Sequence, residues 1–174
     1  GEIINENDIY KFKFKAGNNY NITNNGLIAT KNNGGHKWNC VIIGDKEIPK
    51  NKISKWKIKI GKEKDKSKNF VDYFIGIGEK KITGFLYTNC WSIKMDGNSG
   101  VLLHIKGKSL DYNNHQEKIK EGDIIEVIVD RIKGNLSFAI NDVNYGIACS
   151  DIPKEQELYP SVLLYEQGLS VELI

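Results

Sequence analysis

The chain has 174 residues, 40% hydrophobic and 27% charged, which is typical of one globular domain. A domain of this length buries about 70% of the surface that its unfolded chain exposes, so it needs no disulfide or metal to fold. Its 25 basic and 22 acidic residues are interspersed, and Arg131 is the only arginine, which argues against binding to nucleic acid.

Cysteine usage and apolar run length bound the setting of the protein. Cys40, Cys90 and Cys149 lie far apart with no CxxC pair, which indicates reduced thiols and an intracellular, cytoplasmic location. No apolar run is long enough to span a bilayer, so we expect no membrane insertion. His36 and Cys40 could contribute to a zinc site, but nothing in the spacing supplies the other ligands. We therefore expect no metal and no cofactor.

Strand signals recur along the whole chain, separated by turn residues. In chain order they are residues 27–30, 38–43, 55–60, 71–77, 101–105, 124–130, 135–141, 162–165 and 169–174. The clearest alternation places Trp56, Ile58 and Ile60 on one face of a strand, with lysines on the other. Only residues 116–120 suggest a turn or two of helix. The pattern predicts an all-β fold with little helix, a twisted sandwich of two antiparallel sheets.

The segment from 122 to 171 contains the densest run of these signals. A β-branched run ends at Asp130, and Gly134 follows where a turn needs a positive φ. Leu136, Phe138 and Ile140 then alternate with polar or small residues, as in a half-buried strand.

Several blocks of the chain resemble the SPRY domain family. They are residues 53–60 (ISKWKIKI), 74–78 (FIGIG), 122–130, 134–141 (GNLSFAIN), 146–148, 158–160 and 168–171 (GLSV). Their order and spacing fit the family over residues 34–174. The chain is interpreted as a single domain over 1–174, with an N-terminal extension and first strands in 1–33, and as part of a larger protein.

The resemblance implies a sandwich of concanavalin-like architecture that acts as a non-enzymatic protein-interaction module. Family members present loops at one edge of the sandwich to a peptide or protein epitope. They often serve as a substrate-recognition or scaffold domain of a larger, ubiquitin-ligase-like protein. A protein or peptide partner is therefore expected, and the isolated domain is expected to be a monomer.

Candidate partner-binding residues follow from the resemblance and from residue type. Phe85, Leu86 and Tyr87 lie in a loop that often supplies an aromatic side chain to the ligand pocket. Tyr165, Glu166 and Gln167 occupy the turn before the last strand, where Glu166 is read either as a partner contact or as an ordinary exposed turn residue. Asn32 and Asn33 belong to a polar loop that could form another wall of the cleft.

Two other classes of function remain open from the sequence. Trp38, Trp56 and Trp91 could form a sugar-stacking platform, which would make the protein a carbohydrate-binding sandwich. Trp56 and Trp38 share their faces with apolar strand residues, so core packing is expected for both, while Trp91 stays open.

An enzyme is the least favoured class, because no catalytic arrangement is evident. Glu126 and Asp130 lie about 13 Å apart on one strand face, too far for the paired carboxylates of a glycosidase.

Overall fold

The computed structural model describes residues 8–61, 72–82, 87–96, 100–115 and 117–174. Over these ranges the protein is all-β, without an α-helix, which confirms the predicted fold class. The strands are β1 (Tyr20–Thr23), β2 (Ile28–Lys31), β3 (Cys40–Ile43), β4 (Ile53–Ile60), β5 (Tyr73–Gly78), β6 (Cys90–Asp96), β7 (Gly100–Ile105), β8 (Lys108–Asp111), β9 (Ile124–Asp130), β10 (Asn135–Ile140), β11 (Val143–Cys149), β12 (Tyr159–Leu164) and β13 (Ser170–Leu173).

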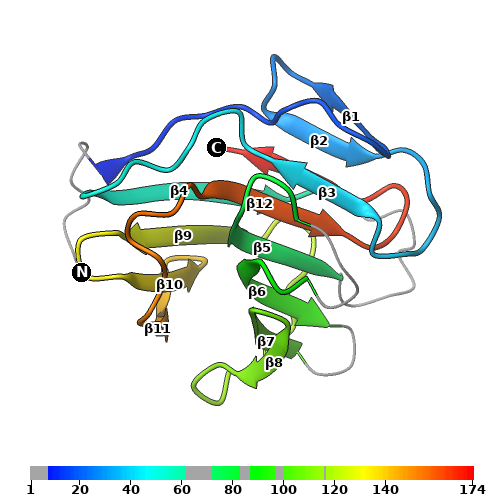
Figure 1. Cartoon of the computed structure of the whole chain (residues 1–174). Coiled ribbons are helices and arrows are strands. Elements are labelled where there is room, and N and C mark those ends of the chain that lie inside the picture. Colours follow the sequence, from blue (N-terminus) through cyan, green and yellow to red (C-terminus); the bar gives the residue numbers. More distant parts are fainter. Residues whose placement is uncertain (1–7, 62–71, 83–86, 97–99, 116) are drawn as a thin grey trace.

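The strands form two antiparallel sheets that pack face to face (Figure 1). One sheet has seven strands in the order β1-β2-β13-β4-β9-β10-β11, and the other has six in the order β3-β12-β5-β6-β7-β8. The segment before β1 runs along one side of the sandwich, from the start of β4 toward β1 (Figure 1). Its Ile9 bridges to Lys55 and its Phe14 bridges to Gly44, so it links the two sheets. No helix in these ranges has the length and apolarity needed to cross a membrane.

The core lies between the sheets and is built by strict alternation. Trp56, Ile58 and Ile60 of β4 are at most 5% exposed. Trp56 pairs with Val127 of β9, and both side chains face inward. The alternation in β4 was therefore predicted correctly, because burial of one face fixes the register.

The two hairpins around β10 show why the strands and turns near it could be predicted from the sequence. At the first, the Asp130 carboxylate accepts hydrogen bonds from the Ile132 and Lys133 amides, both at 3.0 Å, and Gly134 has φ 82°. At the second, Asn141 and Asp142 have φ 49° and 67°, the geometry of a type I′ turn. Both turns use residues that tolerate a positive φ.

Strand β5 is buried on both faces, as the sequence predicted. Tyr73, Ile75 and Ile77 face the core between the sheets, while Phe74 belongs to a second cluster on the outer face. Gly76 also faces outward, and a Cβ there would lie 2.1 Å from the Trp91 carbonyl oxygen. Only glycine fits this close approach of two strands.

Some elements differ from the sequence-based expectation. β1, β6, β8 and β11 were not predicted as strands. β8 is exposed at every position, so it carries no alternation of polarity. Residues 117–120 are irregular and not helical, and they lead into a turn in which the Asp123 amide donates to the Lys120 carbonyl at 3.1 Å. Trp91 is 3% exposed and belongs to the core, which settles the position that the sequence left open.

Candidate functional site

The outer face of the six-stranded sheet is unusually well covered for a sandwich surface. Leu163, Phe74 and Cys90 on this face are at most 3% exposed. Cross-strand neighbours place Val41, Leu163 and Phe74 in one row across β3, β12 and β5. A row of buried apolar residues on an outer face requires a cover from outside the sheet.

Aromatic side chains from several connections supply part of that cover. Trp38 lies 4.6 Å from the Phe74 ring centroid and 5.1 Å from that of Tyr165. Phe74 also stacks on His104 at 4.6 Å and meets the edge of Tyr87 at 6.0 Å. We call Trp38, Phe74, Tyr87, His104 and Tyr165 the aromatic cluster.

The place of Trp38 corrects the sequence-based expectation. Trp38 was expected to share the core face of Cys40 and Ile42, but it is half-buried and packs on the outer cluster. The reason is that β3 begins only at Cys40, so the two-residue alternation does not extend back to Trp38.

Tyr87 ties the β5–β6 connection to the β2–β3 connection. Its hydroxyl donates a hydrogen bond to the Trp38 carbonyl oxygen, and its own carbonyl accepts from the Cys90 thiol at 3.3 Å. The Tyr87 backbone has φ 48°, a left-handed conformation that these contacts hold in place. Burial raises the pKa of the Tyr87 phenol, so it stays a donor at neutral pH.

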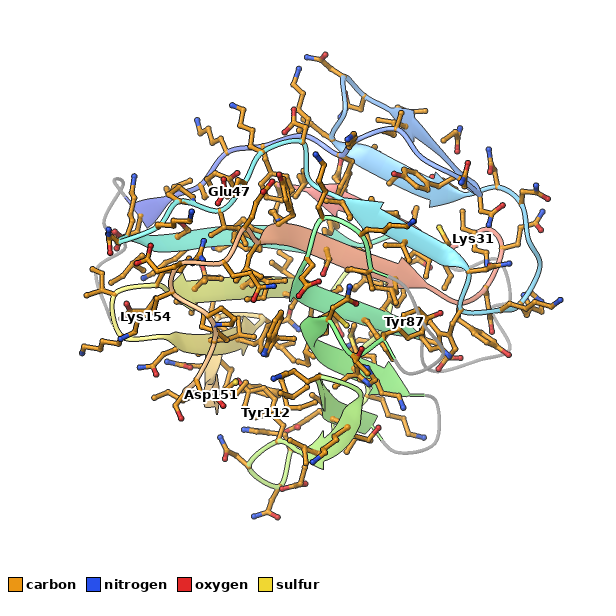
Figure 2. The ribbon with its side chains drawn as sticks, viewed as in Figure 1. Lys31, Glu47, Tyr87, Tyr112, Asp151 and Lys154 are labelled. Atoms are coloured by element: carbon orange, nitrogen blue, oxygen red, sulfur yellow. The ribbon has the colours of Figure 1, made fainter. Side chains whose placement is uncertain are left out.

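Lys31, at the end of β2, ties two more connections together. It is fully buried, and its ammonium donates to the carbonyl oxygens of Lys37 at 2.7 Å and Tyr165 at 2.6 Å. The Lys37 amide also donates to the Tyr165 carbonyl at 3.1 Å. Figure 2 shows Lys31 on the same side of the molecule as Tyr87. Burial lowers the pKa of Lys31, and the nearby Cys40 acts in the opposite direction.

A hollow of about 550 Å³ opens beside the aromatic cluster. Trp38, Val41, Ile82 and Tyr87 supply apolar walls, and this is the Trp38 hollow below. The cations of its lining are Lys15, Lys80 and Lys81, and no carboxylate belongs to the lining within the described ranges. Such a surface suits an apolar anchor that carries negative charge nearby.

The predicted site residues divide into three groups. Phe85 and Leu86 lie outside the described residues. Tyr87 lines the Trp38 hollow, and Tyr165 contacts it through Trp38. The structure therefore brings together Tyr87 and Tyr165, which are far apart in the sequence.

The remaining predicted residues lie around the cluster without lining the hollow. Asn32 and Asn33 are exposed, and the Gln167 amide oxygen accepts a hydrogen bond from the Gly35 amide at 3.2 Å. Glu166 is only 5% exposed, so the reading of Glu166 as an ordinary exposed turn residue is wrong. A chain reversal anchored on Lys31 turns this carboxylate inward.

Sequence reasoning missed the most central members of the site. The alternation of apolar residues predicted that Trp38 faces the core. Phe74 and His104 were not among the predicted site residues. The Gly34–Gly35 pair before Trp38, with φ 89° and 64°, was the signal that a strand had not yet begun.

The described residues include metal-ligand types and three thiols. No group of three or more His, Cys, Asp or Glu residues able to hold a metal ion occurs in the part of the chain that the structure describes. Cys40, Cys90 and Cys149 are free and buried. Burial raises the pKa of Cys40 and of Cys90 to about 12, so both remain protonated thiols at neutral pH.

Comparison with known proteins agrees with this architecture. The SPRY domain family model matches residues 54–174. No curated protein sequence matches the chain significantly.

Solved structures with the same fold include the TRIM65 PSpry domain, with TM-score 0.70 and 10% identity, covering 97% of this chain and 91% of that one. The SPRY domain of human HERC1 has TM-score 0.68 and 21% identity, covering 92% of this chain and 93% of that one. Stonustoxin has TM-score 0.70 and 13% identity; the match covers 96% of this chain but only 29% of that one.

SPRY domains are generally non-enzymatic modules for protein–protein interaction. The family model covers well over half of the chain, and the two-sheet architecture matches structures of SPRY domains over nearly their whole length. The chain therefore belongs to the SPRY domain family.

Proposed function

We propose that this domain recognises a peptide or protein epitope at the Trp38 hollow. One observation carries the proposal: half-buried Trp38 and Tyr87 line a hollow built from connections that are far apart in the sequence. Rigid aromatic side chains in a partly desolvated pocket are the residues that dominate interface energetics. The surrounding sheet holds them in place and leaves the connecting segments to set specificity.

The charge of the lining refines the class of epitope. Lys15, Lys80 and Lys81 surround the apolar walls, and Lys80 and Lys81 are exposed. An epitope with an apolar or aromatic anchor next to Asp or Glu complements this arrangement. Exposed charges of this kind act mainly on association rate and specificity.

The setting in a cell belongs to the same proposal. Three free, buried thiols are consistent with an intracellular, cytoplasmic protein. There the domain would serve as the substrate-recognition or scaffold part of a larger, ubiquitin-ligase-like protein.

A peptide selection followed by calorimetry tests the proposal. Peptides are selected from a displayed random library on the wild-type protein, and their Kd is measured against Trp38→Ala and against Lys80→Gln with Lys81→Gln. We expect Trp38→Ala to weaken binding at least about tenfold, as for a central aromatic anchor. The lysine pair is expected to weaken binding by about threefold, with a smaller dependence on salt.

The matched control is Ile147→Ser on edge strand β11. Ile147 is 56% exposed and does not line the hollow, so its replacement should leave binding unchanged. Each variant is first shown to be folded by thermal melting.

Phe85→Ala is measured as well, because Phe85 is still predicted to contribute to peptide binding. Equal affinity of the wild type and Trp38→Ala for every selected peptide would refute this site.

Carbohydrate binding remains the alternative at the same hollow. It would use Trp38 and Asn39, which both belong to the lining. However, Trp38 already contacts Phe74 and Tyr165, and the described lining has no carboxylate to accept sugar hydroxyls. A glycan array with saturable hits that Trp38→Ala abolishes would favour this alternative over the peptide.

A further inference from the structure

A second hollow, on another part of the molecule, lies where the N-terminal segment meets the last strand. It has a volume of about 700 Å³, within the range of small-molecule sites. Trp56, Tyr10 and Phe12 belong to its lining, and we call it the Trp56 hollow. The Tyr10 hydroxyl donates to the Glu47 carbonyl at 2.7 Å, and Figure 2 shows Glu47 and Tyr87 well separated.

The apolar part of this hollow is a packed aromatic group. The Phe12 and Trp56 ring centroids are 5.6 Å apart and perpendicular, and those of Tyr10 and Phe12 are 5.5 Å apart. At the rim, Ile9 is 46% exposed and Ile174 is 59% exposed. Two exposed isoleucines beside an aromatic floor form an apolar surface that a ligand could cover.

The charged part of the lining is predominantly positive. Among the described residues, the lining includes five lysines (Lys11, Lys13, Lys46, Lys55 and Lys57) and two acidic side chains (Asp45 and Glu126). Lys57 lies 3.8 Å from Asp142, and Lys13 donates to Asn25 at 3.1 Å. Lys11, Lys46 and Lys55 have no ion pair within the described part of the chain.

The backbone at this hollow is already paired, which narrows the kind of ligand. The Lys55 carbonyl accepts from the Tyr10 amide at 2.9 Å, and the Lys57 carbonyl accepts from the Ile174 amide at 3.2 Å. An extended peptide that adds to a sheet needs a free edge, and β4 offers none at these two residues. The hollow therefore presents side chains: aromatic rings below and ammonium groups around.

We propose that the Trp56 hollow binds a small amphipathic carboxylate, an anion with an alkyl or aryl body. The body lies against the aromatic floor between Ile9 and Ile174, and the carboxylate is held by the unpaired lysines of the rim. This site does not depend on the function proposed for the Trp38 hollow, so either can fail alone.

Nuclear magnetic resonance tests the site directly, because each tryptophan indole gives its own resonance. The ¹⁵N-labelled chain is titrated with sodium decanoate, and separately with decyltrimethylammonium, which has the same alkyl chain and the opposite charge. We expect a saturable shift of the Trp56 indole resonance with decanoate only, while that of Trp38 stays in place. A shift confined to Trp38, or an equal response to both compounds, would overturn the proposal.

Two variants address the contacts while leaving the core intact. Lys46→Gln with Lys55→Gln, which removes two of the unpaired lysines, should weaken decanoate binding about tenfold, whereas the exposed pair Lys133→Gln with Lys154→Gln should not change it. Ile9→Asp, which adds an opposing charge at the rim, should also weaken it. Unchanged affinity in both hollow variants, or binding of an acidic peptide at Trp56 without binding of decanoate, would refute the assignment.

Discussion

Two fully buried cations, Arg131 and Lys31, solve the same problem at different places in the sandwich. Arg131 donates to the carbonyl oxygens of Ile48 at 2.9 Å, Pro153 at 3.2 Å and Gln156. It thereby joins the β3–β4 and β11–β12 connections. For both cations the donors serve backbone carbonyls of irregular segments, whose hydrogen bonds no strand ladder supplies.

The two cations differ in what the joined segments do. Of the segments that Arg131 joins, only the start of the β3–β4 connection lines a hollow, the Trp56 hollow. The segments that Lys31 joins carry Trp38 and Tyr165 of the aromatic cluster. Lys154, which marks the β11–β12 connection, lies far from Lys31 in Figure 2. One cation therefore serves the scaffold, and the other serves the candidate site. Replacing each in turn tests this division.

The largest effect is expected for Arg131→Met. Methionine fills much of the space but leaves three carbonyls without their donors, so the free energy of unfolding should fall by about 4 kcal/mol. Urea unfolding of the wild type and the variant measures the difference. Lys133→Met, at an exposed position in the same turn, is the control and should change stability by less than about 0.5 kcal/mol. A loss as small as that of the control would mean that the carbonyls find other partners.

Lys31→Met is expected to lower the free energy of unfolding by about 2 kcal/mol, because two carbonyls lose a charged donor. The effect should concentrate on the site: the Trp38 indole resonance shifts, that of Trp91 in the core does not, and affinity for a selected peptide falls.

Arg131→Lys is the comparison for Lys31→Met, because it keeps a charge but cannot span all three carbonyls. It should lower stability without lowering affinity. If both variants reduce affinity equally, Lys31 has only a general structural role.

The comparison also shows what could be predicted from the sequence. The core strands were readable because their burial follows a period of two, as in Trp56, Ile58 and Ile60, and the turns because Gly134 and Asn141 have few conformational alternatives. Lys31 and Arg131 follow no such rule. Lys31 ends β2 and Arg131 directly follows β9, and only tertiary contacts separate a buried cation from an exposed one.

The candidate site was partly predictable for the same reason. Tyr87 and Tyr165 come from loops that the family resemblance marks, and they do lie near each other through Trp38. Trp38 itself was misplaced, because the alternation of β3 was extended back to Trp38, although the strand begins only at Cys40. The reading of Glu166 as an exposed turn residue rested on its residue type, whereas Glu166 is buried in the turn whose Tyr165 carbonyl Lys31 binds. Contacts between distant segments decide both positions.

The smallest expected effect is on how the free energy of unfolding depends on pH, because a buried lysine titrates at alkaline pH and an arginine does not. Burial lowers the pKa of Lys31 below its ordinary 10.5. At pH values between the lowered pKa of the folded protein and the ordinary pKa of the unfolded chain, the folded protein binds fewer protons than the unfolded chain. The contribution of Lys31 to stability therefore rises with pH through this window. Buried thiols act oppositely on the whole protein: their raised pKa, about 12 for Cys40 and Cys90, makes the folded state lose stability above the ordinary value of 9.0.

A difference between two proteins separates these opposing effects. The gap in unfolding free energy between the wild type and Lys31→Met should widen from about pH 7 to about pH 10, because the thiols are common to both. The interaction between Lys31 and Cys40 widens the gap further. The Lys31 charge lowers the pKa of the Cys40 thiol, so without Lys31 the variant loses more stability at alkaline pH than the wild type does. The corresponding gap for Arg131→Met should stay constant, because arginine does not titrate in this range. If the Lys31 gap is constant or narrows, the Lys31 ammonium is not destabilised by burial, and the two cations are equivalent after all.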